Sequence, residues 1–299
     1  MIQGKSITDQ IGNTPLIEVS NIISKKGIRL FLKLEGDNPG GSVKDRAAFN
    51  MIYKALQRGE IKKGDYLVEA TSGNTGIALA FIAQLLGLHM ILIMPENSTI
   101  ERVKTMQAYG AEVILTSADN GIEGSRDFAI KLHNEKGYFM LNQFENPDNW
   151  KAHYETTGPE IWKDTHGEIT HFVSAMGTTG TIMGVSTFLK EKNKNIEIVG
   201  VQPTDNSKIP GIRKWSEEYL PKIFDKNKVD KIIEVSEEEA IIMTQRLAKE
   251  EGVFAGMSSG GAVIGALKLA DKLENALIVT IISDRGDRYL SSNLFDQND

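Results

Sequence analysis

The chain has 299 residues, of which 40% are hydrophobic and 25% charged, and a formal net charge of −6. This composition predicts a globular protein with a sizeable core, and the negative charge argues against a nucleic-acid-binding surface, which needs clustered Lys and Arg. The chain contains no cysteine, which excludes disulfides, thiolate metal ligands and a cysteine nucleophile. The N-terminus shows no apolar run behind a basic start, so we expect no secretory signal and a cytoplasmic protein.

Short apolar runs alternate with helix-length amphipathic segments along the chain. In chain order, the predicted strands are residues 30–34, 66–69, 90–94, 112–115, 171–174, 196–202 and 277–282. The predicted helices are residues 43–58, 74–86, 100–109, 121–135, 181–191, 237–250 and 260–272. Strands that alternate with helices predict parallel β-α-β units, and hence an open, layered α/β fold that binds ligands at the carboxyl ends of its strands.

Residues 77–94 are nearly all apolar and approach the length of a membrane span. Gln84 and His89 interrupt the run, Gly87 stands where a helix would end, and Pro95 follows the last apolar residues. A helix, a glycine and a short buried strand therefore fit the segment better than a membrane helix does. We expect no contact with a membrane.

The polar, proline-containing segment 143–150 divides two runs of β-α units. We predict that the chain crosses there between two open, twisted α/β lobes, with the ligand-binding crevice between them. The smaller lobe would comprise residues 1–12 and 38–147, and the larger lobe residues 13–37 and 148–299. Residues 204–230 lack periodicity and are expected to form an ordered loop with short helices over the crevice.

Four short, glycine-rich turns stand at or near predicted strand-to-helix junctions. They read Gly-Ser-Val-Lys-Asp-Arg at 41–46, Thr-Ser-Gly-Asn-Thr-Gly at 71–76, Gly-Thr-Thr-Gly-Thr at 177–181 and Gly-Met-Ser-Ser-Gly-Gly at 256–261. A lysine is usually a solvated surface charge. Lys44, however, lies in a turn that lets a ligand approach closely, and desolvation at the start of a helix would lower its pKa toward that of a nucleophilic amine. Lys44 is therefore the candidate catalytic residue.

The turn at 177–181 follows a predicted strand and begins a helix. Backbone N–H groups at a helix N-terminus carry partial positive charge and bind phosphate without a cationic side chain, while threonine hydroxyls add neutral donors. Taken alone, the turn could equally be a plain glycine turn with a threonine N-cap. Together with Lys44, and without a nucleotide-binding motif, it indicates a phosphate cup for a phosphorylated cofactor held covalently.

The turn at 71–76 has a similar form but begins a different helix. Its donors suit a carboxylate, although an ordinary N-cap would also explain them. Two anion cups in one chain fit an amino-acid substrate bound to a phosphorylated cofactor.

Other motifs lack a required partner. Residues 36–44 resemble a nucleotide P-loop without its Gly-Lys-Ser/Thr, and no dinucleotide-type Gly-x-Gly-x-x-Gly follows a strand. Residues 256–260 match a hydrolase nucleophile elbow, but no histidine follows Ser258 to complete a triad. His166 and His171 are five residues apart and do not share a helix face, so we expect no metal site.

Together the four turns resemble the β-family of pyridoxal phosphate (PLP) enzymes, fold type II, which includes cysteine synthases, cystathionine β-synthase and threonine dehydratases. The resemblance runs from Ile-Gly-Asn-Thr-Pro-Leu at 11–16 to the segment 283–291, which is nearly the whole chain. It is closest to the cysteine synthase B type (O-acetylserine sulfhydrylase B). Three segments favour that type: 177–181, Pro-Gly-Ile-Arg-Lys-Trp at 210–215, and Asp-Arg-Gly-Asp-Arg-Tyr at 284–289.

The resemblance implies a role for each matched residue. Lys44 would form the internal aldimine with PLP, Asn74 would bond to the ring hydroxyl oxygen, and Ser258 would face the pyridine nitrogen. The residues that would hold the phosphate are Gly177, Thr178, Thr179, Gly180 and Thr181. Those that would bind the substrate carboxylate are Thr71, Ser72, Thr75 and Gln143. Arg213 would shape the approach of the second substrate.

The implied reaction is the loss of acetate from O-acetyl-L-serine to give an α-aminoacrylate, to which sulfide or thiosulfate adds, with Lys44 as the general base. The products are L-cysteine or S-sulfocysteine, and the family further implies a homodimer. The same fold could instead act on O-phosphoserine or serve as a serine or threonine dehydratase, and an inactive binding paralogue is a remaining alternative. One position departs from the B type, because Ser283 stands where those enzymes often have Cys.

Overall fold

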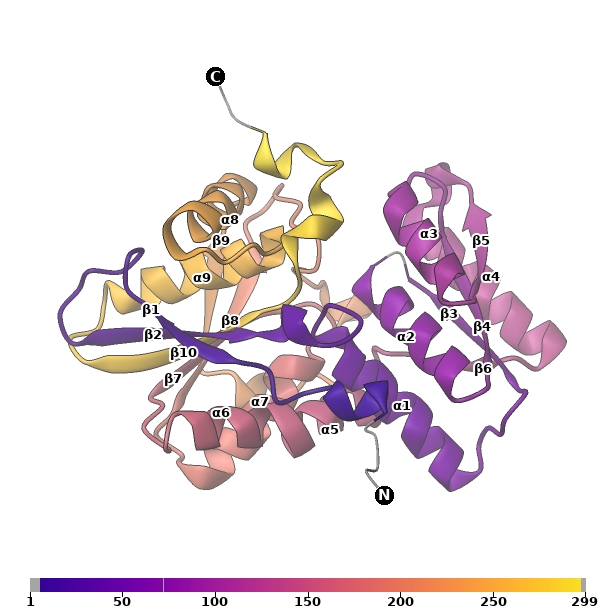
Figure 1. Cartoon of the computed structure of the whole chain (residues 1–299), viewed down its shortest axis with the longest axis horizontal. Coiled ribbons are helices and arrows are strands. Elements are labelled where there is room, and N and C mark those ends of the chain that lie inside the picture. The colour runs from indigo at the N-terminus through magenta and orange to yellow at the C-terminus, as the bar shows by residue number, and fades with distance from the viewer. Residues whose placement is uncertain (1–5, 72, 297–299) are drawn as a thin grey trace.

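The structure is a computed structural model that describes residues 6–71 and 73–296. Two β-sheets lie in separate halves of the molecule, and helix α1 (Lys44–Arg58) lies where the halves meet (Figure 1). One sheet has six strands in the order β1-β2-β10-β7-β8-β9, and the other has four in the order β5-β4-β3-β6. This arrangement confirms the predicted α/β class.

The strands of the six-stranded sheet are β1 (Leu16–Val19), β2 (Ile28–Leu34), β7 (His171–Ala175), β8 (Glu197–Pro203), β9 (Lys231–Val235) and β10 (Ala276–Ile282). In this sheet β1 is antiparallel to β2, and all other neighbours are parallel. The four-stranded sheet is parallel throughout and contains β3 (Tyr66–Ala70), β4 (His89–Pro95), β5 (Glu112–Thr116) and β6 (Phe139–Met140). The central strands are apolar because helices cover both faces of each sheet.

Helices α8 (Glu237–Glu251) and α9 (Met257–Ala270) pack on one face of the larger sheet, and α6 (Gly158–Asp164) and α7 (Gly180–Lys192) on the other. On the smaller sheet, one face packs against α1, α2 (Asn74–Leu85) and α3 (Ile100–Ala108), and the opposite face against α4 (Gly121–Lys136). Helix α5 (Pro147–Ala152) continues through a π-helical turn, His153–Thr157, into α6. These residues carry the chain from the smaller sheet to the larger one.

The segment 77–94 forms the predicted helix, glycine and strand. Helix α2 ends at Leu85, Gly87 adopts a φ of +73°, and β4 begins at His89. The left-handed conformation of Gly87 is the usual way for a helix to end before a sharp turn. Across residues 6–71 and 73–296, no helix is long and apolar enough to cross a membrane.

Several elements differ from those predicted. The sequence analysis missed β1, β6 and β9, which are short strands at the edges of the sheets, and it assigned part of α5 to a polar crossing segment. Helix α9 begins at Met257 rather than residue 260, which places Ser258 in its first turn. The loop 204–230 contains only the two short 3-10 turns Glu217–Tyr219 and Lys226–Lys228, as expected. The proposed lobe boundaries near residues 12, 37 and 147 stay a prediction.

Candidate active site

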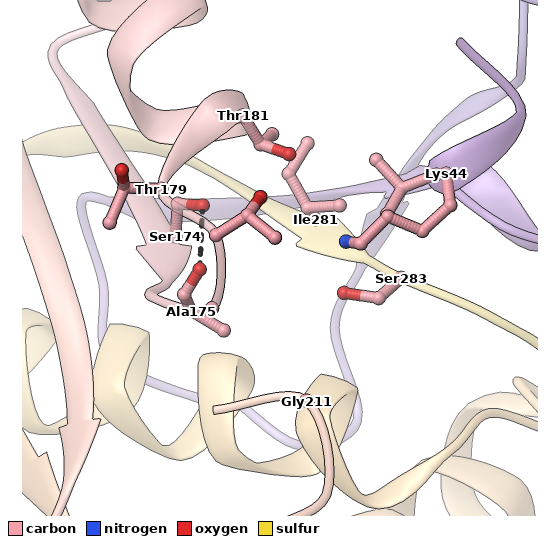
Figure 2. Close-up of a pocket in the computed structure, with 11 residues that line it drawn as sticks. Lys44, Ser174, Ala175, Thr179, Thr181, Gly211, Ile281 and Ser283 are labelled. Carbon is pink, nitrogen blue, oxygen red and sulfur yellow. Dashed lines mark hydrogen bonds between the residues drawn. The ribbon is translucent and has the colours of Figure 1, made fainter. Parts of the chain in front are cut away.

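A polar pocket opens at the carboxyl ends of β7 and β10. Its walls come from four parts of the chain. The lining residues are Val43, Lys44, Ser174, Ala175, Gly177, Thr178, Thr179, Thr181, Gly211, Ile281 and Ser283. Figure 2 shows the Lys44 amine next to Ser283, with Thr179 and Thr181 on the far side of the pocket. The structure thus brings the candidate catalytic lysine and most of the predicted phosphate cup together.

Lys44 is the first residue of α1, and neighbouring bonds hold that helix end in place. The backbone N–H of Val43 donates to the Ser283 carbonyl at 2.9 Å, which ties the start of α1 to the end of β10. Burial lowers the pKa of the Lys44 amine, and the charges of Asp284 and Glu35 oppose that shift. A lowered pKa favours the neutral amine, the form that acts as a nucleophile and a base.

A buried charge network fixes the first turn of α1. The Arg46 guanidinium, 2% exposed, donates to both carboxylate oxygens of Glu35 at 2.7 Å and to those of Glu160 at 2.6 and 2.7 Å. Two bidentate pairs leave a planar guanidinium little freedom. Because Glu35 follows β2 and Glu160 belongs to α6, the network anchors the lysine-bearing helix to the larger half of the molecule.

The turn 177–181 has the geometry of an anion cup. Thr179 adopts a left-handed φ of +69°, and Gly180 begins α7, so the helix N-terminus faces the pocket. A Cβ at Gly177 would lie 2.6 Å from the Gly211 carbonyl oxygen, so glycine is required there. Within the part of the chain that the structure describes, the buried hydroxyl of Thr179 has no hydrogen-bond partner. Such an unpaired donor is costly unless a ligand takes the bond.

The predicted carboxylate site lies around the start of α2. Thr71 and Thr75 are buried, and the Thr75 hydroxyl donates to Gln143 Oε1 at 2.8 Å. The structure therefore brings Thr75 and Gln143 together although 68 residues separate them. Ser72 lies outside the described residues.

Asn74 contacts the segment that follows β10. Its Nδ2 donates to Asp284 Oδ2 at 2.6 Å, and its Oδ1 accepts from Arg288. Ser258 is buried in the first turn of α9, with its hydroxyl 3.5 Å from the position of a Cβ built on Gly211. Ser258 thus lies against the wall of the pocket that contains Gly211.

The segment 210–215 lies along the outside of the predicted phosphate cup. Arg213 is exposed, and its backbone N–H donates to the Met176 carbonyl at 2.8 Å. Trp215 Nε1 donates to the Gly177 carbonyl at 2.8 Å, whereas the Lys214 amine forms ion pairs with Asp205 and Glu234 away from the cup. Arg213 is therefore placed near the pocket with its side chain toward solvent.

The sequence analysis did not identify several residues that contact the candidate site. Asp284 and Arg288 bond to Asn74, His153 lies 3.3 Å from the Thr181 hydroxyl, and Asn149 bonds to Thr178. Asp284 and Arg288 stand in a segment that carried the family resemblance, which was the one available signal for them. Asn149 and His153 stand outside the motifs identified in the sequence, so no sequence signal pointed to them.

No cluster of three metal-ligating side chains occurs in residues 6–71 and 73–296. The His166–His171 pair considered above therefore gains no support as a metal site. The lining of the pocket offers an amine, hydroxyls and backbone N–H groups.

Comparison with known proteins decides the family. Residues 7–284 match the family described as pyridoxal-phosphate dependent enzymes. The chain belongs to this family. It is 57% identical to cysteine synthase B of Pseudomonas aeruginosa over 295 residues, which cover 99% of each chain. It is 55% identical to cysteine synthase B of Escherichia coli over 290 residues, which cover 97% of this chain and 96% of the other. The crystal structure of cysteine synthase from Entamoeba histolytica superposes with a TM-score of 0.94 at 40% identity, covering 100% of this chain and 92% of the other.

These matches confirm the PLP family, the fold and the B-type resemblance predicted from the sequence. As a member of the pyridoxal-phosphate dependent enzymes, the chain takes PLP as its cofactor. Two features of the pocket fit this group. The cup at 177–181, with the unpaired Thr179 hydroxyl, suits a phosphate dianion, and the Lys44 amine reaches the same pocket from the other side.

Proposed function

We propose that this PLP-dependent enzyme converts O-acetyl-L-serine and sulfide to L-cysteine, or forms S-sulfocysteine when thiosulfate is the second substrate. The observation that carries the proposal is the shared pocket of Lys44 and the cup at 177–181. The two curated relatives named cysteine synthase B, matched over nearly their full length, support the substrate class.

In the proposed reaction Lys44 moves the proton at the substrate Cα. PLP, when bound, supplies an electron-withdrawing group that makes this proton acidic. The Lys44 amine, whose pKa burial lowers, takes the proton as acetate leaves and returns it after the sulfur nucleophile has added to Cβ. The cofactor phosphate would be held during both steps by Gly177, Thr178, Thr179, Gly180 and Thr181.

Neutral side chains would orient the cofactor and the substrate. Asn74 is assigned to the ring hydroxyl and Ser258 to the pyridine nitrogen. A hydroxyl does not keep that nitrogen protonated as a carboxylate would, which favours β-elimination over transamination. The substrate carboxylate is assigned to Thr71, Ser72, Thr75 and Gln143.

The visible absorption spectrum of the purified protein tests this function. We expect a cofactor band that shifts when O-acetylserine is added and recovers when sulfide or thiosulfate follows. In Lys44→Ala the band should lose its lysine-linked form and turnover should vanish, whereas Lys54→Ala, on the same helix, should match wild type. Full activity of Lys44→Ala would exclude Lys44 from the chemistry. Faster turnover of O-phosphoserine, or keto acid formed without a sulfur donor, would instead favour one of the alternative activities.

We also propose that the protein is cytoplasmic. On the family resemblance alone, we propose that it forms a homodimer. Light scattering of the purified protein tests the oligomeric state, and a mass equal to that of one chain would contradict the dimer.

A further inference from the structure

The turn that carries Gln143 is held from three sides. The side-chain Oε1 of Gln143 accepts from the Thr75 hydroxyl at 2.8 Å, and the Gln143 backbone N–H donates to the buried Glu69 carboxylate at 3.4 Å. Its backbone carbonyl accepts from Asn149 Nδ2 at 2.7 Å. The preceding residue, Asn142, adopts a left-handed φ of +51°, a conformation that needs such support from its surroundings.

Asn149 lies between this turn and the phosphate cup. Asn149 is 2% exposed, and the same Nδ2 that bonds to Gln143 also donates to the Thr178 hydroxyl oxygen at 3.3 Å. A Cβ at Gly180, the first residue of α7, would lie 2.0 Å from Asn149 Oδ1. Asn149 is therefore packed directly behind the cup, and both hydrogens of its amide are used.

The Asn149 amide also determines whether the Thr178 hydroxyl acts as a hydrogen-bond donor or acceptor toward a ligand. That hydroxyl oxygen accepts from Asn149 Nδ2 and, at 3.4 Å, from the Gly180 N–H. A hydroxyl has one hydrogen to donate and two acceptor lone pairs. With its acceptor capacity used on the protein side, Thr178 is left as a donor for an anion in the cup.

Helix α5, which carries Asn149, is fixed to the helix that carries Lys44. Asn50 of α1 donates to the Asp148 carbonyl at 2.8 Å, and Arg58 of α1 forms an ion pair with the Asp148 carboxylate at 2.7 Å. Asp148 directly precedes Asn149. The Asn149 amide is therefore held in place by contacts with α1, the helix that carries the candidate catalytic lysine.

We propose that Asn149 is a positioning residue that couples the cofactor-phosphate site to the substrate-carboxylate site. This inference rests on the proposed roles of Thr178 and Gln143. A phosphate that binds Thr178 orders the hydroxyl, the hydroxyl fixes the Asn149 amide, and the amide fixes the Gln143 turn. Loss of the amide should therefore weaken the binding of both the cofactor phosphate and the substrate carboxylate.

The test is Asn149→Asp, which keeps the shape of the side chain but replaces its donor group by an acceptor. Apoprotein is titrated with PLP and with pyridoxal, which lacks the phosphate, and KM and kcat for O-acetylserine are measured on the holoenzyme. We expect the preference for PLP over pyridoxal to fall about 10-fold and KM to rise about 10-fold, the upper end of the effect of losing one neutral hydrogen bond at each site, with kcat changed less. If the buried acid prevents folding, Asn149→Ala should show the same pattern. The exposed Asn195→Asp is the matched control.

Two results with the variants, and one with wild type, would overturn the inference. An unchanged PLP-to-pyridoxal ratio in folded Asn149→Asp or Asn149→Ala would leave the proposed function intact but exclude the coupling. A change in the PLP-to-pyridoxal ratio with no change in KM for O-acetylserine would also exclude the coupling. If wild type bound PLP but did not turn over O-acetylserine, the proposed function would fail, and the inference that rests on it would fail as well.

Discussion

Arg213 is the one candidate residue of the site whose side chain is exposed and cationic. It follows Gly211 of the pocket wall by two residues, and its backbone is pinned to Met176 beside the cup. A cation at the mouth of the pocket would attract the anionic oxygens that thiosulfate carries and that sulfide lacks. The expected contribution of Arg213 is therefore a preference among sulfur donors.

For Arg213→Ala we expect kcat/KM with thiosulfate to fall about 10-fold, the effect of one lost charge-assisted hydrogen bond, and kcat/KM with sulfide to stay within about 2-fold. Steady-state kinetics with both donors at fixed O-acetylserine measures this. Lys214→Ala is the control, because the Lys214 amine is already paired with Asp205 and Glu234. Equal losses with both donors would remove Arg213 from donor selection.

At the residue scale, the sequence could predict side chains whose chemistry is visible in a local motif. Lys44 and the cup at 177–181 were proposed in this way, because glycine and threonine at a helix start signal anion binding. Asn149 could not be found, since its partner Thr178 is 29 residues away. Glu69 is a similar case, because it stabilises the Gln143 turn across 74 residues. The importance of such residues depends on tertiary contacts that carry no local pattern.

At the scale of the elements, the sequence predicted the buried strands and long helices better than the short edge strands and the short helix α5. The central strands β4 and β10 are continuous apolar runs, and the predicted ranges fall within two residues of the observed ones. β1 and β9 have only four and five residues and show no strict alternation, so their signal is weak. Helix α5 carried recognisable signs, with Asn146 as the N-cap and Pro147 in the first turn, but its six residues are too few for a periodic pattern.

The packing of α7 against the π-helical turn depends on the absence of a side chain at Gly184. A Cβ there would lie 2.2 Å from the Trp150 carbonyl oxygen and 2.7 Å from the Tyr154 backbone nitrogen. We expect Gly184→Ala to destabilise the fold by about 1–3 kcal/mol, because backbone atoms must move and the gain in helix propensity is only about 1 kcal/mol.

Urea unfolding of the apoprotein measures the effect of Gly184→Ala. Gly261→Ala in α9 is the matched control, since the atom closest to its Cβ would be the end of the Ile212 side chain, at 2.8 Å, and no backbone atom lies among its three nearest neighbours. We expect that variant to stay within about 1 kcal/mol of wild type. If both variants lost the same stability, the close approach at Gly184 would not be the cause.

At the scale of the whole molecule, the segment after β10 joins the two halves. Asp284 accepts from Asn74 Nδ2 and from the Tyr289 hydroxyl, each at 2.6 Å, and Arg288 donates to Asn74 and to the Gly40 carbonyl. These contacts link the start of α2 to the end of the larger sheet across 210 residues. The sequence identified 284–289 as a family signature, but only the assembled fold shows it as a bridge between the halves.

Buried ionisable groups should make the stability of the whole fold depend on pH. Burial raises the pKa of Glu69 to about 7, even though the Asn142 and Gln143 N–H groups favour the charged form. Between the ordinary glutamate pKa of about 4.3 and this value, the native state holds a proton that the unfolded state has released. The free energy of unfolding should therefore fall as pH rises through this window. His153 acts in the opposite direction, because burial lowers its pKa to about 3 and stability is lost as pH falls below about 6.5.

Comparing Glu69→Gln with wild type separates these two contributions, because His153 is common to both proteins. The difference in unfolding free energy, mutant minus wild type, should rise by about 3 kcal/mol between pH 4.5 and pH 8, since each pKa unit corresponds to about 1.4 kcal/mol. Urea titrations of the apoprotein at half-unit steps of pH measure it, with Glu112→Gln at an exposed position of β5 as control. A flat difference across this range would mean that Glu69 is ionised throughout. The Gln143 turn would then be held by a permanent carboxylate, and substrate binding through that turn would not change with pH on account of Glu69.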